Sequence, residues 1–164
     1  MQAMRMELLQ QMPIFGGVDE RALRYLLEPV PSITVAAGVF FFRERDPADC
    51  MYVLESGRVA VLKDWAGREL LLRELGVGDC FGEMALLDLF PRSASVRAVE
   101  ESRAMALTPE HLYRLFEHDP IPFAVIQMNI GREMSRRLRE SDEQLFQATM
   151  SDTQAAPDTA FCSI

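Results

Sequence analysis

The sequence predicts a mainly β domain, a compact roll or barrel of short strands with helices at both ends. Between Ile33 and Leu107, short β-branched and aromatic runs alternate with glycines, whereas apolar residues outside this stretch recur three and four apart. Turn signals at such close intervals fit an all-β roll or barrel rather than alternating β-α units. The three-and-four spacing on either side is typical of amphipathic helices.

Two short helices are expected at the N-terminus, over about residues 4–12 and 19–28. Asp19 stands directly before the second helix, where a side-chain oxygen can accept hydrogen bonds from free backbone amides. The strand runs follow over about 33–107, with a hairpin tip expected at Asp64 to Gly67.

Two further helices are expected after the strands. Thr108, Pro109 and Glu110 read as an N-cap, a first-turn proline and a first-turn acid, which starts a helix over about 109–117. A longer helix is expected over about 121–146, with an apolar stripe along one side. Past Ala148 the residues are mostly small and polar, so we expect one domain over 1–148 and a flexible tail over 149–164.

The composition excludes several classes of partner. The chain has 164 residues, 49% of them apolar, and a net charge of −8. A chain of this length buries enough surface to fold without a disulfide or metal. The negative charge repels nucleic acid and anionic membranes, so neither is an expected partner. Any bound anion must therefore meet a local positive site.

The cysteines and histidines do not form a metal or disulfide pattern. Cys50, Cys80 and Cys162 have no paired spacing, which favours a reducing compartment, and Cys80 is expected to be a buried strand residue. His111 and His118 are too few for a histidine-built metal site. No metal or resident cofactor is expected.

No segment has the length of a membrane span or the character of a signal peptide. The longest apolar run, Val35 to Phe42, falls far short of the ~20 residues that a span requires. Arg5 and Glu7 stand where a signal peptide would be apolar. The expected location is the cytoplasm.

The stretch from Phe81 to Val96 carries the chemistry, because a helix-like turn interrupts the strand pattern there. Gly82 lets the backbone approach a ligand closely, and the turn that follows can direct free amides at an anion. Arg92 and Ser93 can add a guanidinium and a hydroxyl, which together suit one phosphate. Glu83 would repel that phosphate unless it binds something else, such as a sugar hydroxyl. The pattern indicates a phosphate ester with a ribose and a flat base.

These residues resemble a known family. FGEMALL…PRSASV, beginning at Phe81, resembles the phosphate-binding cassette of cyclic nucleotide-binding domains of the catabolite activator and protein kinase A regulatory subunit type. Three further stretches resemble other parts of that family: MPIFGGVD from Met12, FRERDPAD from Phe42 and MYVLESGRV from Met51. The match covers about residues 10–146. Arg45 departs from the pattern, because glycine is usual there. The resemblance implies a double-stranded β-helix, a jelly-roll-like β-roll, flanked by N-terminal and C-terminal helices.

The resemblance also implies roles for individual residues. It places Gly82 and the amides of Met84 and Ala85 in the phosphate cradle. By the same resemblance, Glu83 would contact the ribose 2′-hydroxyl, and Arg92 and Ser93 would contact the cyclic phosphate. The base would contact Leu72 and Leu75, and also Ser141 on the long helix.

The implied function is a receptor and not an enzyme. Cyclic AMP is the expected ligand and cyclic GMP the less favoured one, because Ser93 stands where members that favour cyclic GMP commonly have threonine. Binding is expected to rearrange the C-terminal helices for an unknown effector protein, and the stripe over 121–146 can pair two copies in a homodimer. Only a polar tail follows the long helix, so we expect a free-standing domain without a DNA-binding segment.

Two alternatives stand beside this interpretation. One is a protein-interaction module with the same fold and a non-binding pocket. The other, a cupin-like metal enzyme, is disfavoured because clustered histidines and acids are missing from the strands. The arginine cluster of Arg132, Arg136, Arg137 and Arg139 is expected to be a solvated helix face.

Overall fold

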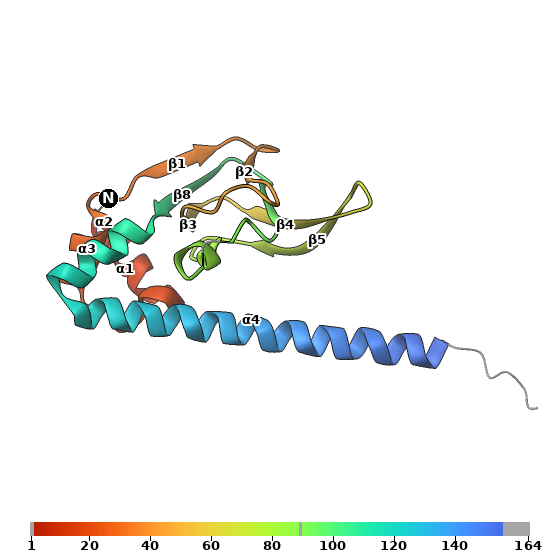
Figure 1. Cartoon of the computed structure of the whole chain (residues 1–164). Helices are drawn as coiled ribbons and strands as arrows, with labels where there is room; N and C mark the ends of the chain where they lie inside the picture. The colour runs from red at the N-terminus through yellow and green to blue at the C-terminus, as the bar shows by residue number, and fades with distance from the viewer. Residues whose placement is uncertain (1, 89, 156–164) are drawn as a thin grey trace, which may run out of the picture.

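The computed structural model describes residues 2–88 and 90–155 as a β-roll with helices at one end and a long C-terminal helix alongside (Figure 1). Two four-stranded antiparallel sheets form the roll. The predicted mainly β fold with flanking helices is therefore confirmed.

Apart from one hairpin, strands that are consecutive along the chain lie in opposite sheets, which is what makes the structure a roll. One sheet has the order β1 (Ser32–Val35), β8 (Ser102–Leu107), β3 (Met51–Ser56) and β6 (Cys80–Phe81). The other has the order β2 (Phe40–Phe42), β7 (Ser95–Ala98), β4 (Val59–Trp65) and β5 (Arg68–Leu75).

Strand β3 separates two apolar cores. Successive side chains of a strand point to opposite faces. Met51 and Val53 therefore pack toward the helices, while Tyr52 and Leu54 pack between the sheets. This explains why the run MYVL is continuously apolar instead of alternating, since all four residues are buried.

The first three long helices close one end of the roll. They are α1 (Gln2–Gln11), α2 (Glu20–Leu27) and α3 (Pro109–His118), and a 3-10 turn, η1 (Pro13–Phe15), joins α1 to α2. Both predicted N-caps are present: Asp19 accepts a hydrogen bond from the amide of Ala22, and Thr108 accepts one from the amide of His111.

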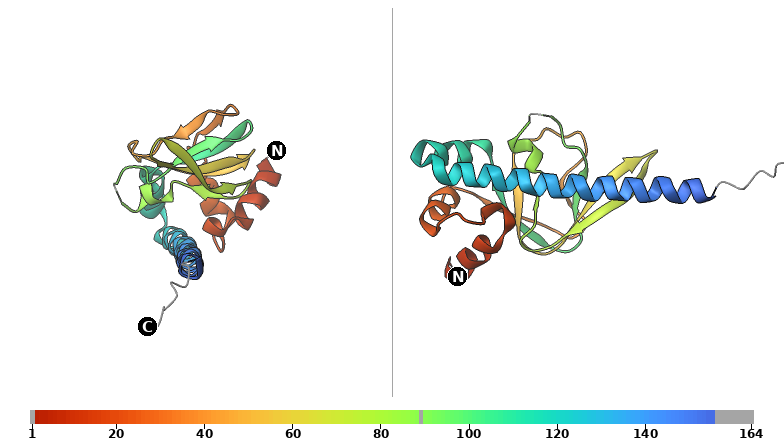
Figure 2. Two further views of the ribbon diagram at one scale, coloured as in Figure 1. Left: turned by 90° about the vertical axis from the view of Figure 1, so that its right-hand side faces the viewer. Right: turned by 90° about the horizontal axis from the view of Figure 1, so that it is seen from below.

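Helix α4 (Pro120–Ala155) is anchored to the helical core by its first half. Ile126 and Ile130 are fully buried there. The buried amide of Asn129 donates hydrogen bonds to the carbonyls of Ile14 and Gly16, at 3.2 and 2.8 Å. From this anchor the helix crosses the roll and extends beyond it (Figures 1 and 2).

The end of α4 differs from our prediction. We expected the helix to end near residue 146 and a flexible tail to begin at 149, but the helix continues to Ala155. The reason is that no glycine or proline interrupts the sequence between Gly131 and Pro157, and the polar side chains of Thr149 and Ser151 donate to backbone carbonyls one turn earlier. The rest of the predicted tail, 156–164, lies outside the described residues.

The predicted hairpin tip is where the sequence indicated. Ala66 and Gly67 have φ of 52° and 76°, as a two-residue hairpin turn requires, and the flanking Trp65 is 73% exposed.

The anchoring of α4 can be tested with two isoleucines of that helix. Ile126→Ala should destabilise the fold by about 2–5 kcal/mol, because it leaves a cavity in the helical core. Ile121→Ala is the matched control and should change stability by less than about 0.5 kcal/mol, because Ile121 is 72% exposed. Urea unfolding followed by circular dichroism measures both, and equal losses would contradict the assignment of Ile126 to the core.

Candidate functional site

A cavity of about 350 Å³ lies between the turn after β6, strands β4 and β5, and helix α4. All nine residues that the sequence analysis singled out line it: Leu72, Leu75, Gly82, Glu83, Met84, Ala85, Arg92, Ser93 and Ser141. Tertiary structure therefore brings together residues from β5, the cassette and α4. Their roles in binding stay predictions.

Gly82 determines how closely the cassette turn approaches Arg92. Its φ is +74°, a left-handed conformation that favours glycine, and the 3-10 helix η2 (Glu83–Leu86) starts directly after it. A Cβ at this position would stand 2.5 Å from Nη1 of Arg92. Only glycine accommodates both the backbone conformation and the adjacent guanidinium.

The Arg92 guanidinium is buried beside the cavity with little to satisfy it. It lies 4.0 Å from the ring centre of Phe42, a cation-π contact. Its two terminal nitrogens donate long hydrogen bonds of 3.4 Å, one to the carbonyl of Gly82 and one to Asp49, whose side chain is 84% exposed. The buried Nε has no hydrogen-bond partner among the described residues. A buried cation with an unused donor is suited to an anionic ligand.

The backbone of Arg92 is held more firmly than its side chain. Arg45 donates from its amide to the carbonyl of Arg92 at 2.8 Å, and the amide of Arg92 donates to the carbonyl of Asp46 at 2.9 Å. Arg45 has φ of +73°, so the arginine adopts the left-handed conformation for which the family pattern has glycine. The departure in sequence therefore leaves the local turn in place. Lys63 also donates to the carbonyl of Ser93, at 2.7 Å.

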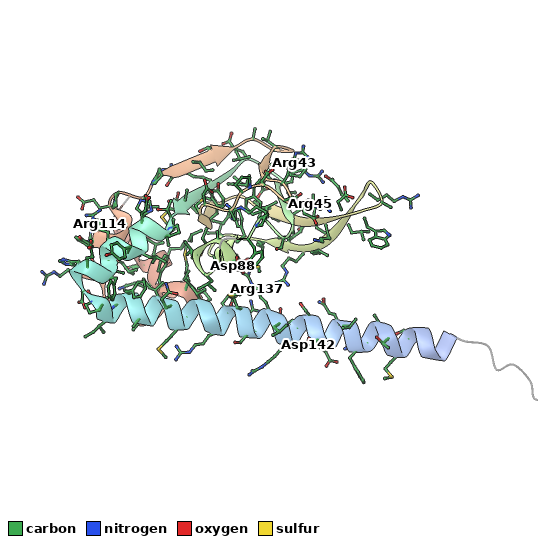
Figure 3. The ribbon with its side chains drawn as sticks, in the orientation of Figure 1. Arg43, Arg45, Asp88, Arg114, Arg137 and Asp142 are labelled. Carbon is green, nitrogen blue, oxygen red and sulfur yellow. The ribbon has the colours of Figure 1, made fainter. Side chains whose placement is uncertain are left out.

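Glu83 is buried and forms an ion pair that the sequence analysis missed. Nη1 of Arg137, on α4, lies 2.5 Å from Oε1 of Glu83. Arg137 also contacts Glu133 and the carbonyl of Cys80, at 2.9 and 2.8 Å. Burial opposes the charge of Arg137, but the neighbouring negative groups outweigh it and raise its pKa. Figure 3 shows Arg137 on the side of α4 that faces the roll.

The expected solvated face is therefore wrong for Arg137, whose side chain is only 17% exposed. The helix pattern carried a signal for this position. Met134, Leu138 and Ser141 recur at helical spacing and all line the cavity, and Arg137 falls on the same face. What the sequence lacked was the location of Glu83 relative to that face.

The amides of the cassette turn are less free than the resemblance implied. The amide of Ala85 already donates to the carbonyl of Gly82, at 3.1 Å, because the turn is a closed 3-10 helix. Ala85 would therefore have to share or exchange that bond to contact a phosphate.

An apolar wall faces the charged groups across the cavity. Leu75 is buried, whereas Leu72 and Leu138 are 55% and 63% exposed, so this wall is partly open to solvent. Ser141 lies at its edge and donates its hydroxyl to the carbonyl of Arg137 at 3.0 Å. A flat, partly polar group fits between such surfaces.

The cavity is electropositive in a negatively charged protein. Arg73, Arg92 and Arg137 line it, with Glu83 as the acidic residue among the lining side chains, whereas the whole chain has a net charge of −8. This is the local positive site that an anion requires.

In the described part of the chain, no three histidines, cysteines or acids are grouped so that they could hold a metal ion. Cys80 is buried as predicted, and burial raises its pKa to about 12, which keeps the thiol protonated. Cys162 lies outside the described residues. No helix within residues 2–88 and 90–155 is long and apolar enough to cross a membrane.

The comparisons with known proteins agree with this geometry. The cyclic nucleotide-binding domain family model matches residues 32–119. The chain is 30% identical over 147 residues to a CRP-like cAMP-activated global transcriptional regulator of Mycobacterium tuberculosis. The matched region covers 89% of this chain and 64% of the regulator.

Two solved structures extend the comparison. The catabolite activator protein of Thermus thermophilus has a TM-score of 0.74 and 32% identity, over 84% of this chain and 63% of that one. The regulatory domain of Toxoplasma gondii protein kinase A, solved with cAMP, has a TM-score of 0.64 and 29% identity. The matched region covers 70% of this chain and 44% of that one. The chain thus spans less than two thirds of these relatives. The family match over residues 32–119, more than half of the chain, shows that this chain belongs to the cyclic nucleotide-binding domain family.

Proposed function

We propose that this protein is a receptor for a cyclic nucleotide, with cyclic AMP preferred, and that it acts as a regulatory module and not as an enzyme. The observation that carries the proposal is that one cavity contains two buried charged groups opposite an apolar wall. These groups are the guanidinium of Arg92, which has an unused donor, and the carboxylate of Glu83. These three features correspond to the phosphate, the ribose and the base of one ligand.

The cyclic phosphate would bind at Arg92. The unused Nε and the two long hydrogen bonds leave this guanidinium able to form charge-assisted bonds with phosphate oxygens. The hydroxyl of Ser93 lies beside it on the cavity wall. Desolvation by Phe42 and the cassette strengthens such a contact relative to one in water.

The base would lie against Leu72, Leu75 and Leu138. All three line the cavity, and Ser141 offers a hydroxyl at the end of that wall. A hydroxyl can donate to one purine and accept from another, so this residue favours neither base. The preference for cyclic AMP rests on Ser93 and on the names of the relatives.

Binding would be read out by α4, which we propose to repack against the roll. Arg137, Leu138 and Ser141 bring this helix to the cavity, while its first half is held in the helical core. A ligand that contacts one arrangement of the helix better than another shifts the population toward it. An effector protein would then contact the repositioned helix.

The second candidate function is an interaction module with an empty pocket. One observation favours it: Glu83 and the amide of Ala85 are already satisfied within the chain, so a ligand is not needed to complete them. The orphaned Nε of Arg92 argues against it, because an interaction module gains nothing from an unsatisfied buried donor.

A homodimer through α4 is also proposed. The exposed apolar residues Leu145, Phe146 and Met150 lie in the last part of α4. An isolated amphipathic helix gains little stability from propensity alone, so a second copy would bury this surface.

Arg92→Ala tests the nucleotide site. The variant should fold and should lose at least about 2 kcal/mol of binding free energy for cyclic AMP, roughly thirtyfold in Kd. Protein stripped of nucleotide by unfolding and refolding is titrated with cyclic AMP and cyclic GMP in a calorimeter. Arg97→Ala is the control, because Arg97 of β7 pairs with Glu69 of β5 and neither residue lines the cavity. Unchanged affinity in Arg92→Ala, or no heat from the unmodified protein, would favour the interaction module.

Gly82→Ala tests the contact between the cassette turn and Arg92. An added Cβ would displace the Arg92 guanidinium and should weaken cyclic AMP binding by about tenfold or more. Gly38→Ala is the matched control, because Gly38 has a similar φ of +80° with no atom within 4 Å of an added Cβ. Its backbone strain should lower stability without changing affinity. Equal affinity in the two variants would contradict the proposed geometry.

Leu145→Glu tests the homodimer. The added charge should dissociate the dimer in sedimentation velocity, because it would be desolvated in a helix seam. Gln144→Glu adds the same charge at the next exposed position and should be tolerated better. A monomeric unmodified protein, with and without cyclic AMP, would exclude the dimer.

A further inference from the structure

Lys63 is the only lysine among the 17 lysines and arginines of the chain, and it connects two segments that are far apart in sequence. From β4, its ammonium group donates to Oε1 of Glu44 at 2.6 Å and to the carbonyl of Ser93 at 2.7 Å. An ammonium group carries three donors, so one group can serve both acceptors. Lys63 thus joins the loop between β2 and β3 to the end of the cassette.

The carboxylate of Glu44 is a fixed partner for this ammonium group. The Glu44 side chain is only 17% exposed, and its Oε2 accepts a hydrogen bond from the amide of Asp64 at 3.2 Å. The backbone amide of Glu44 donates to the hydroxyl of Ser95 at 2.8 Å. The hydrogen bonds from Lys63 and Asp64 lower the pKa of Glu44, so its carboxylate stays charged at neutral pH.

Both peptide groups on either side of the Ser93 α-carbon are held by hydrogen bonds. The carbonyl of Arg92, on one side, accepts from the amide of Arg45 at 2.8 Å. The carbonyl of Ser93, on the other side, accepts from Lys63. Because these two bonds constrain the backbone of Ser93, they also determine the direction in which its side chain leaves the backbone.

Two donors next to this held peptide are available to a ligand. Ser93 and Ala94 line the cavity, whereas Lys63 does not. The carbonyl and the amide of a trans peptide point in opposite directions, so the amide of Ala94 is directed away from Lys63. That amide has no hydrogen-bond partner among the described residues. The hydroxyl of Ser93 makes only a long contact, of 3.9 Å, with the sulfur of Met84.

We propose that Lys63 is a positioning residue of the phosphate site: by holding the Ser93 carbonyl from outside the cavity, it directs the Ser93 hydroxyl and the Ala94 amide at one exocyclic oxygen of a cyclic phosphate. The inference rests on the proposed nucleotide-binding function. Arg92 remains available for the other exocyclic oxygen. Loss of Lys63 should therefore weaken one of the two phosphate contacts more than the other.

The test uses the two diastereomers of adenosine 3′,5′-cyclic phosphorothioate, in each of which sulfur replaces one exocyclic oxygen. Sulfur is the weaker hydrogen-bond acceptor, so each diastereomer weakens one of the two contacts. Kd values for both diastereomers and for cyclic AMP are measured by calorimetry. The unmodified protein should bind one diastereomer about fivefold or more tightly than the other, the scale of one hydrogen bond. Lys63→Met keeps the length of the side chain without its donors and should reduce this ratio to about twofold or less.

Two further variants show whether Lys63 acts through Ser93. Ser93→Ala should also reduce the ratio, and adding Lys63→Met to it should change the ratio little, because both substitutions remove the same contact. Lys63→Arg keeps the charge but presents its donors in a planar fork, so its ratio should be intermediate. This variant replaces Lys63→Met if the latter does not fold.

Arg97→Met is the matched control. Arg97 lies in the same sheet and pairs with Glu69, and its side chain is 37% exposed, compared with 44% for Lys63. It does not line the cavity and forms no hydrogen bond with the cassette. Arg97→Met should therefore keep the full ratio between the two diastereomers.

The outcomes distinguish a failure of this inference from a failure of the proposed function. If the unmodified protein binds neither cyclic AMP nor the phosphorothioates, both fail. If it binds them but does not distinguish the diastereomers, or if Lys63→Met weakens both equally, Lys63 is merely structural and only this inference is overturned. A ratio that is reduced in Lys63→Met and retained in Arg97→Met supports it.

Discussion

The burial of the Arg92 guanidinium against the ring of Phe42 is the constraint on which the cassette depends. A buried cation needs close polar neighbours, and the ones it has come from the turn at Gly82 and from the exposed Asp49. That requirement explains the glycine at position 82, because a side chain there would occupy the space of the guanidinium. The backbone of Arg92 is held separately, by hydrogen bonds with the backbone of Arg45 and Asp46.

Helix α4 connects three different environments within one element. Its first half belongs to the helical core through Ile126 and Ile130, its middle reaches the cavity through Arg137, and its last part carries exposed apolar residues. No glycine or proline lies between Gly131 and the end of α4 at Ala155, which keeps the middle and last parts of the helix on one rigid axis. A ligand in the cavity would contact the same rigid part of the helix that carries the exposed apolar residues, which is the physical basis for the proposal that α4 is the output of the site.

Charge is distributed so that the cavity differs from the rest of the surface. The chain has a net charge of −8, yet the arginines at 73, 92 and 137 converge on one cavity. Such an arrangement concentrates positive potential where a small anion can enter and leaves the remaining surface unfavourable for polyanions. Because Arg137 pairs with Glu83, the charges of these two side chains offset each other at one part of the cavity, whereas the part at Arg92 remains cationic.

The sequence by itself determined the all-β roll, the helix caps at Asp19 and Thr108, and the cassette residues from Gly82 to Ser93. These features are local: strand alternation, turn glycines and capping side chains depend on neighbours close in the chain, and the cassette pattern is contiguous.

The tertiary structure decided which long-range partners meet. Glu83 and Arg137 are 54 positions apart, and an ion pair between segments so distant leaves no periodic signal in the sequence. The sequence pattern likewise did not predict two local conformations. The amide of Ala85 is used within a closed 3-10 turn, and Arg45 adopts a left-handed conformation while its amide donates to the carbonyl of Arg92. Residue identity thus specified the elements and the chemical groups, whereas packing of α4 across the roll decided which groups are buried, paired or left free for a ligand.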